Sequence, residues 1–551
     1  MPVDVLFLFA GMGTALLLAL ALITLIYRRR ARRKLHVPVP SGRLGAVTSF
    51  ALDHRRDLVV IRRDDVEDLI LIGGPNDLTI ESDFMSRGPW EPDEPGEDGL
   101  DQDKSEAPLA SIRPRFELAQ RLLIGPGLVP LALLSGLAGA GAGLICGLFR
   151  LALVQADQLR LALPGWLADR PLLGCTLMIV GAATAAGFSA WLVHRFSQNA
   201  AGSGIPHVEA VLGGELPPAP FILIPVKFFG GLLAIGAGLA LGREGPCVQM
   251  GATLAERLGR IFGRNLADCR SLLAAGAGAG LAAAFNAPFA GSAFVLEELI
   301  RRFETRNAIA ALGASGSAIM VVRLLTGPAP DFAVANIPYP APIDNLLCIA
   351  LGVVAGLLGT VYNRVLLGAL SIADRLGAWP VELRAAIVGA AVGALAWFAP
   401  GLPGGGDLLT QQTLNGAETL ALLPLIYVLR LVLGAASYAA GTPGGLFAPL
   451  LALGAQMGYL FGGLFDPGGV DSTSHAVSFA LVGMAALFTA AVRAPLTGMI
   501  LVTEMTDNSR LLLPMLAACF SAMAVATMLR EPPIYDSLKQ RTPALSEKRV
   551  S

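Results

Sequence analysis

The sequence predicts an all-α polytopic membrane protein that is built from two repeated halves. Its 551 residues are 54 % hydrophobic and only 15 % charged, and its mean hydropathy is +0.62. Such a composition is typical of a chain with many transmembrane helices rather than of a soluble domain. Its 64 glycines suit membrane helices that pack closely. Short motifs that recur in the same order indicate the duplication.

The residue types of metal and catalytic sites are scattered along the chain. The six cysteines and five histidines show no metal-ligand or redox spacing, and no set of nucleophile, base and acid is visible. We therefore expect no metal, no cofactor and no enzymatic activity. The net charge of −1 gives no reason to expect a nucleic acid as a partner.

The first 34 residues are predicted to form an N-terminal transmembrane helix with a basic collar. The apolar run at 5–27 is long enough to span a bilayer. Asp4 precedes this run, and six of the seven residues at 28–34 are Arg or Lys. Positive charge stays on the cytoplasmic side, so the N-terminus should lie outside the cell. A cleavable signal peptide has its charge before the apolar run, which excludes that interpretation.

Residues 35–85 are predicted to form a small β-rich cytoplasmic unit. Two strands are expected at 57–64 and 67–74 around a turn, and a third is possible at 78–81. Three short strands are near the lower limit for a stable sheet. The layout of residues 1–83 is similar to that of FliO-type flagellar-biogenesis proteins. The alternative is a membrane-anchored accessory domain of unknown role and unknown partner.

The rest of the chain is divided by its composition. Residues 86–111 are acidic and rich in Pro and Gly, which predicts a disordered cytoplasmic linker. Residues 112–542 alternate apolar runs with Gly/Pro breaks, and residues 543–551 form a C-terminal tail. Several apolar runs are too short to cross a bilayer alone. Broken helices at membrane depth are tolerated only where they line a cavity or are buried in protein.

An internal repeat places two halves at about 124–305 and 345–510. The motif at 287–291 (APFAG) returns at 494–498 (APLTG), which is 207 positions later. The break at 242–246 (GREGP) is matched 203 positions later at 445–449 (GLFAP). A duplicated membrane half with broken helices in corresponding places is the mark of an inverted-repeat transporter, whose breaks meet at mid-membrane near the substrate.

Three breaks are predicted to bind a small anion. They lie at 202–206 (GSGIP), 242–246 and 444–449, and each places glycine before a helix whose first turn contains proline. Helix N-termini present N–H groups and partial positive charge. A fixed cation would hold the anion too tightly to conduct it. Glu244 would compete with the anion and accept a proton on release. The alternative is that the breaks are loops between spans.

These motifs resemble those of the CLC family of chloride channels and chloride/proton exchangers. The three breaks match the family's anion-binding signatures, and the segments at 225–231 (PVKFFGG), 494–498 and 501–508 match as well. The likeness extends from about residue 113 to 542. It implies a homodimer with one anion pathway in each subunit. We expect a multi-pass protein of the bacterial inner membrane.

The resemblance also implies roles for individual residues. Ser203 resembles the serine that donates a hydrogen bond to the central chloride, and Tyr535 the tyrosine that closes the site from the cytoplasm. Glu244 resembles the external gating glutamate that exchanges places with chloride. The expected anion ligands are Ser203, Gly204, Ile205, Leu446, Phe447 and Tyr535.

Glu298 resembles the internal proton-relay glutamate, which the channels of the family usually lack. The sequence therefore favours a chloride/proton exchanger over its alternative, a passive channel gated by voltage or pH. A lower alternative is a scaffold or assembly factor that acts through the N-terminal module. Ser203 favours chloride over nitrate, because the related nitrate exchangers have proline at that position.

Each assignment has a structural alternative. Glu298 has Arg301 and Arg302 at helical spacing, and Glu244 adjoins Arg243. Tyr535 is also the type of residue that anchors a helix at the membrane interface.

Three further residues adjoin the signatures. Lys227 either faces the pore and attracts anions or extends to a lipid headgroup. His207 stands where the family more often has an acid, and it can make transport pH-sensitive. Cys247 stands where the family often has Thr, and neither of these last two residues replaces a named ligand.

Overall fold

The computed structural model describes residues 44–53, 56–63, 66–72, 78–85, 127–334, 342–416, 420–465 and 472–547. The chain divides into two compact units, residues 1–105 and 106–551. The predicted transmembrane helix at 5–27 and the predicted linker at 86–111 lie outside the described residues. The resemblance to FliO-type proteins stays a prediction.

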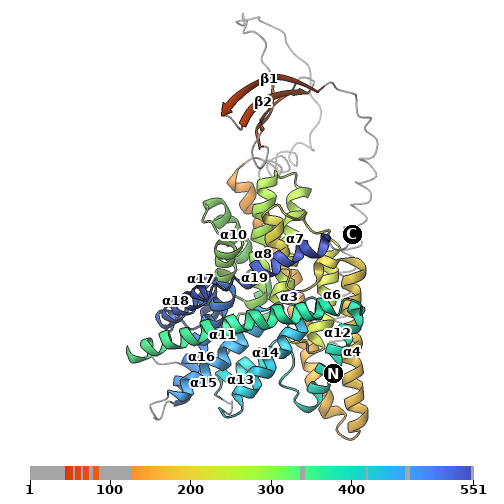
Figure 1. Ribbon diagram of the computed structural model, residues 1–551, viewed down its shortest axis with the longest axis vertical. Coiled ribbons are helices and arrows are strands. Elements are labelled where there is room, and N and C mark those ends of the chain that lie inside the picture. The colour runs from red at the N-terminus through yellow and green to blue at the C-terminus, as the bar shows by residue number, and fades with distance from the viewer. Residues whose placement is uncertain are drawn as a thin grey trace, which may run out of the picture. The chain divides into compact units, whose positions relative to one another are not determined.

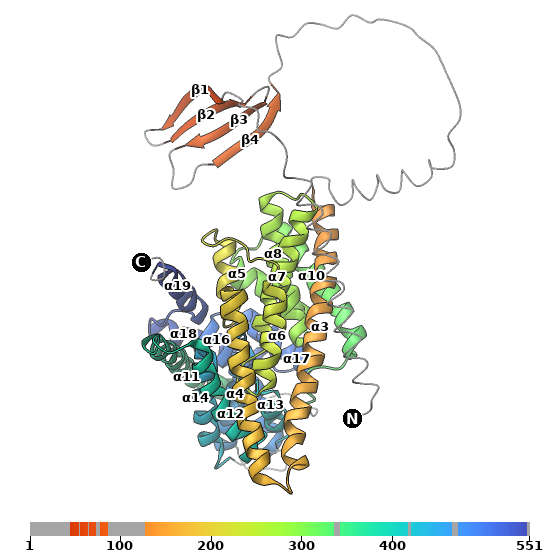
Figure 2. The same ribbon diagram turned by 90° about the vertical axis from the view of Figure 1, so that its right-hand side faces the viewer.

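The first unit contains a four-stranded antiparallel sheet with the strand order β1-β2-β3-β4 (Figure 2). Its strands are β1 (Leu44–Asp53), β2 (Arg56–Arg63), β3 (Val66–Ile72) and β4 (Leu78–Met85). In the register, Val59 on β2 pairs with Ser49 on β1 and with Ile70 on β3. The sequence did not predict β1, whose pairing with β2 is interrupted by two register shifts.

The second unit is helical (Figure 1), and in its described residues each of the two halves contains eight α-helices. The first half contains α3 (Leu128–Trp166), α4 (Pro171–Phe196), η1 (Gln198–Ala200), α5 (Ile205–Leu212), α6 (Leu223–Gly236), α7 (Glu244–Ile261), α8 (Leu266–Phe285), α9 (Pro288–Phe294), the π-helical turn η2 (Val295–Leu299) and α10 (Thr305–Thr326). The second half contains α11 (Pro342–Arg375), α12 (Val381–Phe398), α13 (Asp407–Leu414), α14 (Leu423–Ala439), α15 (Phe447–Leu464), α16 (Ser472–Val492), α17 (Pro495–Thr506) and α18 (Leu512–Met528). The last helix, α19 (Ile534–Glu547), continues past the boundary expected at residue 542.

Seven helices in the described part of the chain are long and apolar enough to cross a membrane: α3, α4, α10, α11, α12, α15 and α16. The prediction of an all-α polytopic membrane region is therefore confirmed. Helices α5 and α13 have only eight residues each, far too few to span a bilayer. All residues of α5 but the last are buried, as a broken helix in a membrane must be.

Equivalent glycines hold equivalent helix pairs together in the two halves. A Cβ on Gly251 of α7 would collide with the backbone oxygen of Gly276 on α8. In the second half, a Cβ on Gly454 of α15 would lie 2.6 Å from the oxygen of Gly483 on α16. The close approach of these backbones explains why glycine recurs at both positions.

Candidate functional site

The three predicted breaks are joined by backbone hydrogen bonds. The N–H of Gly202 donates to the oxygen of Thr442 at 3.0 Å, and the N–H of Gly444 donates back to Gly202 at 3.1 Å. Gly242 and Gly445 exchange two hydrogen bonds, at 2.9 and 2.6 Å. The loop before α15 therefore lies between the other two loops, and the N-termini of α5, α7 and α15 meet.

Glycine is required where the loops pass closest. Gly204, which precedes α5, has a φ of +84°, a conformation that residues with a Cβ rarely adopt. A Cβ on Gly245 would lie 2.8 Å from the hydroxyl oxygen of Ser203. On Gly445, a Cβ would overlap the carboxylate of Glu244. A side chain at position 245 would therefore displace Ser203, and one at position 445 would displace Glu244.

The hydroxyl groups of Ser203 and Tyr535 are buried at this meeting point. The two hydroxyls interact with each other, and neither makes a hydrogen bond to any other described residue. The Ser203 N–H donates to the hydroxyl of Tyr438 at 3.3 Å, and the ring of Tyr535 lies 5.9 Å from that of Phe447. Buried hydroxyls in native proteins normally have well-formed hydrogen bonds, so two that have at most each other mark a position for a ligand.

The remaining expected ligands supply backbone groups. Ile205 is the first residue of α5, and Leu446 directly precedes α15; both are buried. The first N–H groups of a helix have no acceptor within the helix, and they attract negative charge.

Glu244 is the first residue of α7, and its side chain is fully buried. One carboxylate oxygen, Oε1, accepts a hydrogen bond from the Phe447 N–H at 2.6 Å. The other oxygen, Oε2, has no hydrogen-bond partner among the described residues. The carboxylate thus occupies the N-terminus of α15, a position that favours negative charge.

Arg243 points away from the carboxylate of its neighbour. Its guanidinium donates to Asp331 at 2.8 Å, to Asp407 at 2.9 Å and to the backbone oxygen of Ala284 at 2.8 Å. Asp331 also accepts from Arg150 of α3 at 2.5 Å. This network, which we call the Arg243 cluster, joins α3, α7, the α10–α11 connection and α13. A Glu244–Arg243 pair, the alternative interpretation, is therefore not formed.

Lys227 on α6 is fully buried beneath the first break. Its ammonium group donates to the backbone oxygens of Ala200 at 3.0 Å and Gly202 at 2.7 Å. The side chain therefore does not extend to a lipid headgroup. It holds the loop that carries Ser203.

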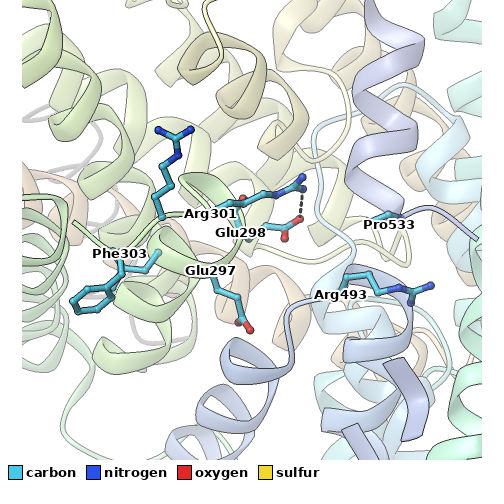
Figure 3. Close-up of a pocket in the computed structure, with 8 residues that line it drawn as sticks. Glu297, Glu298, Arg301, Phe303, Arg493 and Pro533 are labelled. Carbon is cyan, nitrogen blue, oxygen red and sulfur yellow. Dashed lines mark hydrogen bonds and ion pairs between the residues drawn. The ribbon is translucent and has the colours of Figure 1, made fainter. Parts of the chain in front are cut away.

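Glu298 lies in the π-helical turn η2 and is 3 % exposed. Its Oε1 is 3.6 Å from Nη2 of Arg301 (Figure 3). The same nitrogen of Arg301 also donates to Asp536 of α19 at 2.8 Å. The hydrogen bond to Asp536 is the main factor that raises the pKa of Arg301. The Glu298–Arg301 ion pair, which is the structural alternative to a proton-relay role, is thus present. The ion pair does not enclose the carboxyl group, because Glu298 also lines a cavity of about 440 Å³.

Glu297, the preceding residue, caps a helix of the other half. Its carboxylate accepts from the N–H groups of Leu496 at 2.9 Å and Thr497 at 2.6 Å, in the first turn of α17. The two neighbouring glutamates therefore differ in their surroundings, since only Glu297 is fully engaged with backbone N–H groups.

Glu504 of α17 makes the reciprocal contact. It accepts from the N–H groups of Phe289 at 3.1 Å and Ala290 at 2.8 Å, in the first turn of α9. We call these two carboxylate contacts, from Glu297 to α17 and from Glu504 to α9, the crossed caps. The 207-residue offset aligns the two glutamates in the sequence, but the alignment alone does not indicate that each binds the other's helix.

The remaining residues beside the signatures are buried but lie outside the set of expected ligands. His207 of α5 has an Nε2 without a hydrogen-bond partner among the described residues. The backbone oxygen of Cys247 accepts a hydrogen bond from the thiol of Cys146 at 3.7 Å. In the described residues, no three His, Cys, Asp or Glu side chains are placed to hold a metal.

Sequence reasoning missed Tyr438 and Asp331. Tyr438 is 235 positions from Ser203, and Asp331 is 88 positions from Arg243. Neither residue belongs to a motif, so no local pattern could identify it.

Comparison with known proteins assigns the chain to a family. The family model described as voltage gated chloride channel matches residues 185–527. An H(+)/Cl(−) exchange transporter ClcA of Cronobacter sakazakii is 38 % identical over 423 residues, which cover 75 % of this chain and 90 % of the relative. The ClcA of Klebsiella pneumoniae is 36 % identical over 446 residues, 79 % of this chain and 94 % of that protein. The solved structure of a slow cyanobacterial Cl−/H+ antiporter has a TM-score of 0.72 and 33 % identity, and the match covers 75 % of this chain and 98 % of that one.

Proposed function

The chain belongs to the voltage-gated chloride channel family, the CLC family, and on this premise we propose that it exchanges chloride for protons across a membrane. The relatives described as exchangers cover most of its length and support exchange over passive conduction. The proposed anion ligands are the hydroxyls of Ser203 and Tyr535 together with the backbone around Gly204, Ile205, Leu446 and Phe447.

The contact between Glu244 and the Phe447 N–H is the observation that carries the mechanism. A carboxylate and a chloride ion cannot both accept from this N–H group, so their occupancy is mutually exclusive. When chloride displaces the carboxylate, Glu244 is free to accept a proton. When Glu244 returns to the N–H group as a carboxylate, it releases that proton.

Glu298 supplies the second proton-carrying group in this proposal. It is buried, yet it borders the cavity that Figure 3 shows, so one side of the carboxyl group can exchange protons with water. Arg301, which lines the same cavity, holds the side chain through its 3.6 Å contact. The ion pair positions the group, and the cavity gives protons a route to it.

We also propose a homodimer in the bacterial inner membrane, with the N-terminus outside and the β-rich unit in the cytoplasm. The resemblance to CLC proteins and the charge pattern of residues 1–34 support this arrangement. Exposed apolar side chains on α9, α17 and α18 are available to a second copy or to lipid. They include Phe289, Leu496, Leu513 and Phe520.

Flux measurements on the full chain in liposomes test the proposal. Chloride that enters down its gradient should drive protons out of the vesicles against a proton gradient. Empty liposomes and liposomes with equal chloride on both sides serve as controls. If chloride enters but no uphill proton movement occurs, the protein is a channel and the exchange mechanism is wrong.

A further inference from the structure

A second cavity lies in the helical unit, apart from the one that Glu298 lines. It has a volume of about 380 Å³ and is formed by the C-terminal part of α7, the N-terminal part of α8 and the connection from α5 to α6. Leucine and valine side chains form its apolar part, among them Val211, Leu216 and Leu273. Three arginines, Arg260, Arg264 and Arg270, line it as well. We call this cavity the basic pocket.

The basic pocket carries an excess of positive charge. Arg260 forms an ion pair with Glu256. Asp268 is shared by Arg264, at 2.5 Å, and by Arg306. These two carboxylates neutralise only part of the local charge, because the arginines outnumber them even before Arg270 is included.

Arg270 is the group available to a ligand. Its side chain is exposed, and it makes no ion pair with a described residue. A guanidinium group in this state can donate two parallel hydrogen bonds to a phosphate. The other arginines contribute to the potential without losing their carboxylate partners.

The exposed part of the basic pocket includes an apolar side chain as well as charged ones. Leu266 lines the pocket and is 69 % exposed, alongside the exposed Arg270. Water is a poor environment for the leucine side chain, whereas the acyl chains of a lipid would cover it favourably. A ligand that combines a phosphate with a hydrocarbon chain satisfies both parts of the cavity.

Contacts to α19 place the basic pocket at one membrane face. Lys539 of α19 forms a 2.5 Å ion pair with Glu215, the neighbour of the pocket residue Leu216. The same helix carries Tyr535, which the proposed function places at the cytoplasmic entrance. Basic pockets between membrane helices on the cytoplasmic side bind anionic headgroups, because anionic lipids are abundant in that leaflet.

We propose that the basic pocket binds the phosphate headgroup of an anionic phospholipid from the cytoplasmic leaflet, with Arg270 as the main ligand. The assignment to the cytoplasmic face rests on the proposed function, whereas the phosphate and hydrocarbon chemistry rests on the pocket itself. Because α7 begins at Glu244 and ends at the pocket, a bound lipid stabilises the helix that carries the gate. We therefore expect lipid binding to raise thermal stability.

Thermal unfolding of the full chain in neutral detergent, titrated with phosphatidylglycerol, tests the proposal. The melting temperature should rise with the lipid concentration and level off once the pocket is saturated. Arg270→Gln should raise the half-saturating lipid concentration about fivefold. Arg375→Gln is the matched control. This arginine is exposed at the end of α11, near the contacts of Arg541 with Ser371 and Asp374, and it makes no ion pair with a described residue. The melting temperatures without lipid check that both variants fold.

Each outcome of the titration decides the proposal. It is overturned if the wild type shows no saturable rise, or if Arg270→Gln and Arg375→Gln respond alike. Inorganic phosphate is the second arm, and an equal saturable rise with phosphate alone would identify a soluble anion instead of a lipid. Exchange is measured separately in phosphatidylcholine vesicles. A failure of lipid binding with intact exchange would therefore leave the proposed function standing.

Discussion

The second and third Gly/Pro breaks occupy equivalent places in the repeat but have different chemistry. Glu244 and Phe447 both open a helix, and the 203-residue offset makes them equivalent positions. The first half places a carboxylate there, and the second half places a backbone N–H that binds this carboxylate at 2.6 Å. The duplication supplies two facing helix ends, and divergence at one position supplies the carboxylate that we propose as the gate.

In the crossed caps, by contrast, the two halves have not diverged. Glu297 and Glu504 are equivalent by the 207-residue offset, and each binds the first-turn N–H groups of the other's helix. Here both halves keep the same residue and the same contact. We infer that, at these two pairs of equivalent positions, the symmetric pair marks a structural contact and the asymmetric pair marks the proposed gate.

The strongest test of this contrast is Glu244→Gln, which restores a neutral side chain to the asymmetric position. The amide cannot carry a proton, so proton flux should fall by about 100-fold or more. Chloride flux should persist and lose its dependence on pH. Both fluxes are measured in liposomes with chloride and pH electrodes. Retained proton coupling would remove Glu244 from the mechanism.

Glu298→Gln tests whether Glu298 differs in function from its neighbour Glu297, which lies in the same turn, η2, and lines the same cavity. Because Glu298 borders the cavity, its loss should abolish proton coupling while chloride flux continues. Arg302→Gln, which changes the same cavity without removing a carboxyl group, is the control and should leave coupling unchanged. If both variants behave alike, the cavity rather than the carboxyl group matters.

Asp331→Asn tests the Arg243 cluster, which belongs only to the first half because Leu446 occupies the equivalent position of Arg243. The Asp331 side chain is 3 % exposed and pairs with two arginines. Its neutralisation leaves the buried Arg150 without a carboxylate partner and leaves Arg243 with Asp407 alone, and it should cost about 3 kcal/mol of unfolding free energy. Asp407 is 48 % exposed, and its ion pair among the described residues is with Arg243 alone, so Asp407→Asn should cost less than about 1 kcal/mol. Equal losses in denaturant titrations would contradict this ranking.

The elements that the sequence predicted well are those with local signals. Gly/Pro breaks, apolar spans and the two repeat offsets can all be recognised within a few residues, and together they indicated the helical membrane fold. Contacts between distant segments have no such signal. The hydrogen bond of Tyr438 to Ser203 and the ion pairs of Asp331 depend on how the loops pack.

The crossed caps give the smallest and most symmetric expected effect. In Glu297→Gln and in Glu504→Gln, one of the two acceptor oxygens is replaced by a donor that cannot bind an N–H group. Each variant should therefore lose about 1 kcal/mol of unfolding free energy, the usual value of a helix cap. Proton coupling should survive in both, because neither carboxylate is proposed to carry protons. Equal destabilisation in thermal unfolding with intact coupling would support a structural role for both. A loss of coupling in Glu297→Gln alone would show that the symmetry of the contacts conceals a difference in function.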